Sequence, residues 1–124
     1  MQRVRIEEHA GKRLIVVDGT DVPAEAYADV LRAGAALVMK EPLGSVRLAT
    51  VVTRARFGAG AADRIKAYSG AIRPHLLASA VVGLSTLQRV LFVTLRPFMH
   101  GTVRDFATLA EAREWLAGFE PPKA

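Results

Sequence analysis

The segment LASAVV at residues 77–82 runs directly into GLST at residues 83–86, and this junction decides the fold. The first part is a short, continuous apolar run, which is typical of a strand covered on both faces of a sheet. The second part is a turn that opens a helix, because the side-chain oxygen of Ser85 or Thr86 can cap the first free N–H groups. A buried strand that leads into a helix is the repeating unit of an α/β domain.

The same pattern extends in both directions from this junction. Residues 3–7 alternate polar and apolar side chains and residues 13–18 are a continuous apolar run, so the two predict an antiparallel hairpin. Further strands are predicted at residues 48–52 and 102–106, and amphipathic helices at about residues 21–41, 62–72, 85–96 and 109–119, with Asp21 and Thr108 as caps. We therefore predict one α/β domain over residues 1–120, with a mostly parallel five-stranded sheet, an antiparallel N-terminal hairpin strand and four helices. Residues 121–124 are predicted to be a C-terminal tail.

The charge of the chain is concentrated in its middle. The 124 residues include 17 Lys and Arg against 12 Asp and Glu, but residues 42–104 hold nine of the basic residues and Asp63 as their only acid. The chain has no cysteine, which excludes disulfides, thiolate metal sites and cysteine nucleophiles. General binding of nucleic acid is disfavoured, because few aromatic residues are interleaved with the basic ones and no nucleic-acid motif is present. We expect a localised site for an anion or a protein partner instead.

Targeting and membrane-spanning segments are not expected. Residues 1–8 lack the apolar run of a signal peptide, and the longest uncharged stretch, residues 75–88, falls short of the roughly 20 apolar residues that cross a bilayer. We expect a soluble, cytoplasmic protein.

Three parts of the chain resemble a known family. These are the sequence AVVGLSTLQRVL at residues 80–91 with Arg-Pro-His before it, Arg56-Phe57 after the middle strand, and VRDF at residues 103–106 followed by EAREWL at residues 111–116. Over about residues 3–119 the chain resembles the stage II sporulation protein AA-like family. That family belongs to the STAS-like superfamily of sulfate-transporter and anti-sigma-factor-antagonist domains, and some of its names derive from CRAL-TRIO-type lipid-exchange domains.

The resemblance implies a compact STAS-like fold without enzymatic activity. In true antagonists, a hydroxyl after the middle strand is phosphorylated within an Asp-Ser-(Ser/Thr)-Gly-like sequence. The corresponding region here is VTRARFG at residues 52–58, where Thr53 is the only hydroxyl and the acid and adjacent glycine are missing. Thr53 is thus the phospho-acceptor that the resemblance implies.

Motifs for catalysis, cofactors and metals are weak. Residues 58–63 (GAGAAD) depart from a dinucleotide fingerprint because Asp63 replaces its third glycine, so we expect a βα loop. The turn at residues 83–87 lacks the second glycine of a hydrolase nucleophile elbow, and we expect a helix cap there. His9, His75 and His100 are widely separated, and we expect a structural hydrogen bond for His75. We predict no catalytic residue, no cofactor and no metal.

The third predicted helix is apolar over more than one face. At helical spacing, we expect the side chains facing the sheet to be Leu84, Leu87, Val90, Leu91, Leu95 and Phe98. Phe92 and Val93 fall outside this stripe, beside Arg89 and Arg96, which lie seven residues apart and point the same way. This surface predicts either a contact between two copies of the chain or an apolar ligand site rimmed by arginines.

A second hypothesis concerns the ends of the strands, where α/β sheets commonly bind ligands. Arg54, Arg56 and Arg89 are predicted to cluster near the turn at residues 83–86, with Ser85 and Thr86 as further ligand contacts. These features together predict a non-enzymatic domain, expected to be a homodimer, that binds a small anionic or lipid-like molecule or a protein partner. The alternative is a regulatory protein-interaction domain resembling anti-sigma-factor antagonists, switched at Thr53 or Ser85.

Overall fold

The computed structural model describes residues 3–98 and 102–121. The chain forms one α/β domain around a five-stranded sheet, with strands β1 (Val4–His9), β2 (Lys12–Asp18), β3 (Val46–Val51), β4 (Leu76–Val82) and β5 (Thr102–Phe106). Its helices are α1 (Ala24–Val38), α2 (Ala61–Ile72), α3 (Thr86–Leu95) and α4 (Leu109–Gly118), with short 3-10 turns η1 (Arg73–His75) and η2 (Arg96–Phe98). The predicted fold class is confirmed. Among the described residues no helix has the length and apolar character needed to span a bilayer.

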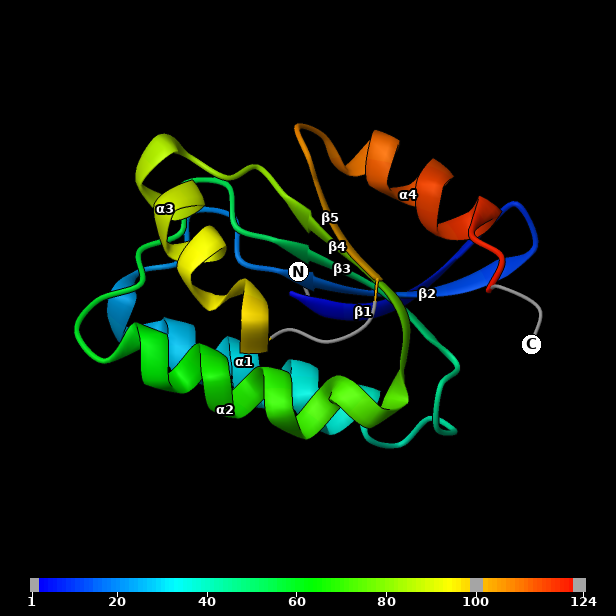
Figure 1. Ribbon diagram of the computed structural model, residues 1–124, viewed down its shortest axis with the longest axis horizontal. Coiled ribbons are helices and arrows are strands. Elements are labelled where there is room, and N and C mark those ends of the chain that lie inside the picture. Colours follow the sequence, from blue (N-terminus) through cyan, green and yellow to red (C-terminus); the bar gives the residue numbers. More distant parts are fainter. Residues whose placement is uncertain (1–2, 99–101, 122–124) are drawn as a thin grey trace.

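The strands lie in the sheet in the order of the sequence, β1 to β5. β1 pairs antiparallel with β2, as predicted, and every later pair is parallel. Each crossover therefore steps one strand in the same direction, and crossovers of one hand put α1, α2 and α3 on the same face. Helix α4 follows the last strand and covers the opposite face (Figure 1).

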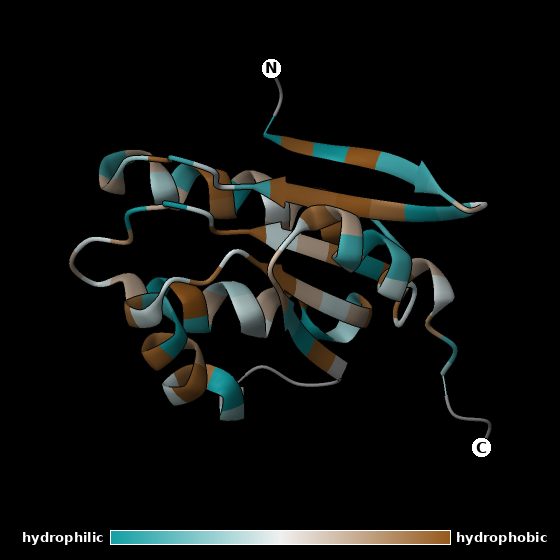
Figure 2. Cartoon of the chain, turned by 90° about the horizontal axis from the view of Figure 1, so that it is seen from above, coloured by the Kyte–Doolittle hydropathy of each residue, from teal (hydrophilic) through white to brown (hydrophobic). Residues whose placement is uncertain are grey.

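The core lies on both sides of the sheet because β2 is apolar at successive positions. Ile15 and Val17 pack with α1 on one face, whereas Leu14 and Val16 pack with α4 on the other. Figure 2 shows the contrast between this hydrophobic strand region and β1 at the sheet edge, which alternates hydrophilic and hydrophobic residues. On the α4 face, Trp115 packs between Phe106 and Phe119, with ring centroids 5.5 Å from each.

The helix starts test the predicted caps. Ser85 caps α3 with a side-chain oxygen that accepts from the N–H of Gln88, and Thr108 caps α4 by accepting from the N–H of Glu111. The prediction for α1 was wrong, because Pro23 occupies its N-cap position. Asp21 instead has a left-handed backbone, with φ of 56°, and its carboxylate binds Arg54.

Candidate functional site: a cavity beneath helix α3

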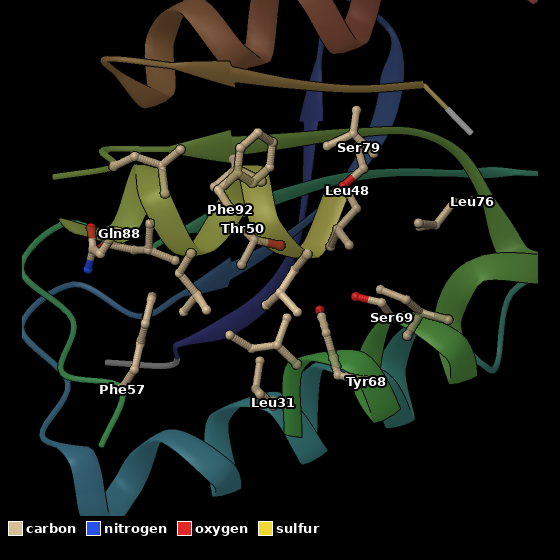
Figure 3. Close-up of a pocket in the computed structure, with 18 of the residues that line it drawn as sticks. Leu31, Leu48, Thr50, Phe57, Tyr68, Ser69, Leu76, Ser79, Gln88 and Phe92 are labelled. Carbon is tan, nitrogen blue, oxygen red and sulfur yellow. The ribbon is translucent and has the colours of Figure 1, made fainter. Parts of the chain in front are cut away.

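Helix α3 packs against α2 and η2, whereas its backbone stays farther from the strands that the structure describes. A cavity lies between α3 and the sheet, with α1 and α2 as its other walls, and apolar side chains such as Leu31, Leu48 and Phe92 line most of it (Figure 3). The volume of the cavity is about 80 Å³, and its open side continues to solvent. Ordinary ligand pockets measure about 300–1,000 Å³, so a small organic molecule would place part of its body in the cavity and the rest in the open side.

The cavity exists because the strands beneath α3 carry short side chains. On this face β3 presents Thr50 and β4 presents Ser79 and Val81, all of which line the cavity. The alternate residues of β4, such as Ala80, pack against α4 on the other face. Small residues on both faces of β4 thus let α4 pack closely and leave free volume under α3.

Gln88 holds the first turn of α3 to the loop that follows β3. Its side chain is buried, and its Nε2 donates to the carbonyl oxygens of Val52 and Ala55, each at 3.0 Å. Its Oε1 accepts from the N–H of Ser85 at 2.8 Å, which completes a capping box. Because these bonds go to the loop, the helix is anchored at its start without filling the space over the sheet.

One region of the cavity wall is polar. The hydroxyls of Thr50 and Tyr68 lie close to one another in Figure 3, with Ser69 next to Tyr68, and Ser79 lines the same cavity farther along the sheet. The Tyr68 oxygen is fully buried and reaches hydrogen-bond geometry with no group in the described part of the chain. Burial raises the pKa of the Tyr68 phenol well above its ordinary value, so Tyr68 stays protonated at neutral pH and can donate. Burial likewise raises the pKa of Tyr27, on the α1 wall, to about 12.

A second hollow, the loop groove, runs between the loop after β3 and the outer side of α3. Arg56, Gly58, Ser85, Leu87 and Val90 are among its lining residues, and its wall is shared with the cavity at Phe57, Gln88 and Leu91. The structure therefore places two of the predicted ligand residues, Arg56 and Ser85, on one hollow. Arg56 is exposed and has no ion pair among the residues that the structure describes.

The other two arginines of the predicted cluster turn away from each other. Arg54 binds Asp21, in the loop after β2, through Nε at 2.6 Å and a terminal nitrogen at 3.0 Å. Arg89 binds Asp105 of β5 at 2.6 Å. The Arg54 guanidinium lowers the pKa of Asp21 below its ordinary value, so this pair is charged at neutral pH. Both arginines are neutralised by partners that lie in opposite directions along the sheet.

The predicted sheet-facing stripe of α3 was wrong at Leu87 and Val90, which are 80% and 61% exposed, and right at Leu95, which is buried. Leu84 and Leu91 of the stripe line the cavity, and the surroundings of the Phe98 side chain lie outside what the structure describes. Gln88 and Phe92, which were not in the predicted stripe, are buried. The reason is Gln88, whose buried side chain donates to the carbonyls of Val52 and Ala55 and so fixes which side of α3 faces inward. In this orientation of α3, Leu87 and Val90 are exposed to solvent and Phe92 lines the cavity.

The remaining residues of α3 that were predicted to form the site are divided between its buried side and its exposed side. Phe92 lines the cavity, whereas Val93 is on the exposed surface. The Arg96 guanidinium lies 5.6 Å from the centre of the Phe92 ring and donates to the Val103 carbonyl at 3.2 Å. Thr86, the first residue of α3, is exposed next to its cap Ser85.

Thr53 packs against the backbone of the turn that follows β4. A Cβ added at Gly83 would lie 2.0 Å from the Thr53 hydroxyl oxygen, so the two residues occupy the same small space. The Thr53 side chain is half-buried there.

The predicted structural role of His75 is confirmed, since its Nδ1 donates to the Glu41 carbonyl at 2.8 Å. His9 pairs with Glu114, and His100 lies outside the described residues. Within the described ranges no three His, Asp or Glu side chains come together as a metal site.

Sequence reasoning missed the polar residues of the cavity, Thr50, Tyr68 and Ser79. One signal was present: Tyr68 and Ser69 follow Ile65 and precede Ile72 at helical spacing, so they belong to the inward side of α2. Comparison of the chain with family models, with curated proteins and with solved structures gave no match.

Proposed function

We propose that this protein is a non-enzymatic binding domain, of the STAS-like type that the sequence resembles, which takes a small, mainly apolar, lipid-like molecule into the cavity beneath α3. The observation that carries the proposal is the cavity itself, walled by three helices and the sheet with mostly apolar side chains. Interiors of proteins are normally close-packed, so a space of this size beside a few convergent polar groups favours a ligand. The proposal keeps the cytoplasm as the compartment, since a chain without cysteine needs no oxidising surroundings.

Two arginines line the hollows without an ion pair among the described residues and could meet an acidic group on the ligand. Arg54 and Arg89 already bind aspartates, whereas Arg73 lines the cavity and Arg56 lines the loop groove, and both are exposed. We therefore place an anionic end of the ligand, where it has one, at the solvent side of either hollow, with its apolar part inside.

The test is to fill the cavity. Ser79→Leu adds apolar volume to the floor of the cavity and occupies space that a ligand would need. We expect it to weaken binding of the neutral fluorescent probe N-phenyl-1-naphthylamine by about tenfold, which corresponds to roughly 1.4 kcal/mol. Val93→Leu is the matched control on the exposed side of α3 and should leave the dissociation constant unchanged. Equal binding by both variants and the wild type, with thermal unfolding showing that all are folded, would refute a site in this cavity.

A second candidate function is protein interaction of the kind made by anti-sigma-factor antagonists. It is favoured by the apolar stripe of α3, defined by Leu87, Val90 and Val93, which is exposed in the single chain. Contiguous exposed apolar residues mark contact surfaces, and we propose a second copy of the chain as the partner. In this alternative the hydroxyl of Thr53 or Ser85 is the switch, and phosphate incorporation that is lost in Thr53→Val or Ser85→Ala identifies which.

A further inference from the structure

The Tyr68 hydroxyl is a buried donor whose polar neighbour, the Thr50 hydroxyl, is close enough to lower its pKa but does not reach hydrogen-bond geometry. Its oxygen is fully buried and has no hydrogen-bond partner in the described part of the chain, although Thr50 faces it (Figure 3). Roughly nine in ten buried polar groups in proteins are hydrogen-bonded. A buried exception that faces a cavity therefore indicates that the partner comes from the cavity.

We propose that the ligand presents an uncharged hydrogen-bond acceptor, a carbonyl oxygen, to the Tyr68 hydroxyl, with its apolar body against the leucines under α3. The inference rests on the proposed function and adds the chemical class of the ligand. Tyr68 is the donor, and the hydroxyls of Thr50 and Ser69 lie beside the acceptor position. The bound molecule is thus a ketone, ester or amide with a hydrocarbon body.

The acceptor is uncharged because of what surrounds Tyr68. Among the described residues that line the cavity, Arg73 is the only cation, and it is exposed rather than beside the Tyr68 oxygen within the apolar wall. A carboxylate at the depth of Tyr68 would lose its hydration without a buried cation to replace it. A carbonyl loses far less hydration and matches a single neutral donor.

The experiment compares ligands of nearly the same shape: isopropylbenzene, which has no polar atom, acetophenone, which has a carbonyl, and benzoate. Each is titrated by isothermal calorimetry into the wild type, Tyr68→Phe and Tyr27→Phe. Tyr27 lines the same cavity from α1, so Tyr27→Phe is a matched control that removes a hydroxyl from another wall.

We expect Tyr68→Phe to weaken acetophenone binding about fivefold, the usual effect of one neutral hydrogen bond. Isopropylbenzene binding to Tyr68→Phe should be unchanged, whereas Tyr27→Phe should change the affinities for the two neutral compounds by the same factor. Without ligand, the melting temperature of Tyr68→Phe should be no lower than that of the wild type, because an unpaired hydroxyl is removed.

The outcomes separate the two proposals. If neither neutral compound binds the wild type, the cavity is not a ligand site and both proposals fail. If both bind but Tyr68→Phe affects them equally, the carbonyl inference alone fails, and an ordered water is the partner of Tyr68. Tighter binding of benzoate than of acetophenone overturns the uncharged acceptor, and a clear loss of melting temperature in Tyr68→Phe shows that the hydroxyl has a protein partner.

Discussion

The side chain of Gln88 makes hydrogen bonds to one backbone N–H group and two backbone carbonyls, and these bonds are lost when the side chain is removed. Its amide binds the carbonyls of Val52 and Ala55 and the N–H of Ser85. We expect Gln88→Ala to lower the free energy of unfolding by about 2 kcal/mol, because buried polar groups lose their partners and a cavity is added. Urea unfolding measures this loss.

The matched control for Gln88 is Thr86→Ala, on the same helix but exposed. It should change the free energy of unfolding by less than about 0.5 kcal/mol, as surface substitutions do. Equal losses in the two variants would show that the hydrogen bonds of Gln88 to the loop contribute nothing to stability beyond helix propensity.

Residue-scale prediction succeeded where a side chain acts on its near neighbours in sequence. The caps Ser85 and Thr108 were found because a capping oxygen reaches an N–H only three residues on. Tyr68 could not be identified in this way, because its isolation depends on Thr50, eighteen positions earlier in the chain, and on free volume under α3. Contacts between residues so far apart in the chain are set by packing and produce no periodic pattern in the sequence.

At the scale of elements, the turn after β4 is held by the close approach of Gly83 and Thr53. Gly83 has φ of 83° and no space for a Cβ, which would lie 2.0 Å from the Thr53 oxygen. Gly11, with φ of 78°, has nothing within 4 Å of the same position. The two glycines therefore share the backbone strain of an alanine substitution but not the steric clash.

We expect Gly83→Ala to destabilise the protein by at least about 1 kcal/mol more than Gly11→Ala. The positive φ costs each variant about 1–2 kcal/mol, and overpacking adds a similar amount at Gly83 alone. Chemical unfolding of both variants gives the difference, and Thr53→Ala should recover part of it in the Gly83→Ala background. Equal destabilisation would mean that the turn moves freely and that Thr53 does not fix it.

The elements themselves were predictable because each strand is apolar and each helix is amphipathic. The orientation of α3 was not, since a helix that is apolar all round offers several faces to the sheet. Its true orientation depends on Gln88 finding two loop carbonyls. Local pattern defines an element well, but the direction of its faces comes from contacts distant in sequence.

At the scale of the molecule, the basic middle of the chain turns out to be largely structural. Besides Arg54 and Arg89, Arg47 donates to the carbonyls of Leu116 and Phe119 at the end of α4. Other members of the block also have internal partners: Arg64 at the Ala59 carbonyl, Arg96 at the Val103 carbonyl, and Arg104 over the rings of Phe106 and Trp115. The net charge could be read from the sequence, but which arginines bind carbonyls, aromatic rings or aspartates could be seen only in the fold.

The exposed stripe of α3 makes a prediction for the whole molecule. If a second copy covers Leu87, Val90 and Val93, sedimentation velocity of the wild type gives a dimer, and Val90→Lys shifts it to a monomer because a charge would be buried in the contact. Ala110→Lys, exposed on α4 at the opposite face of the sheet, is the control and should leave the mass unchanged. A wild-type monomer at every concentration would refute the second candidate function in this form.

The placement of the aromatic residues on the two faces of the sheet provides natural optical reporters. The only tryptophan of the chain, Trp115, lies on the α4 face, whereas both tyrosines, Tyr27 and Tyr68, line the cavity on the other. Indole emission therefore follows the packing of α4, while tyrosine absorbance follows occupancy beneath α3. One unlabelled sample can thus distinguish a ligand that fills the cavity from one that loosens the whole domain.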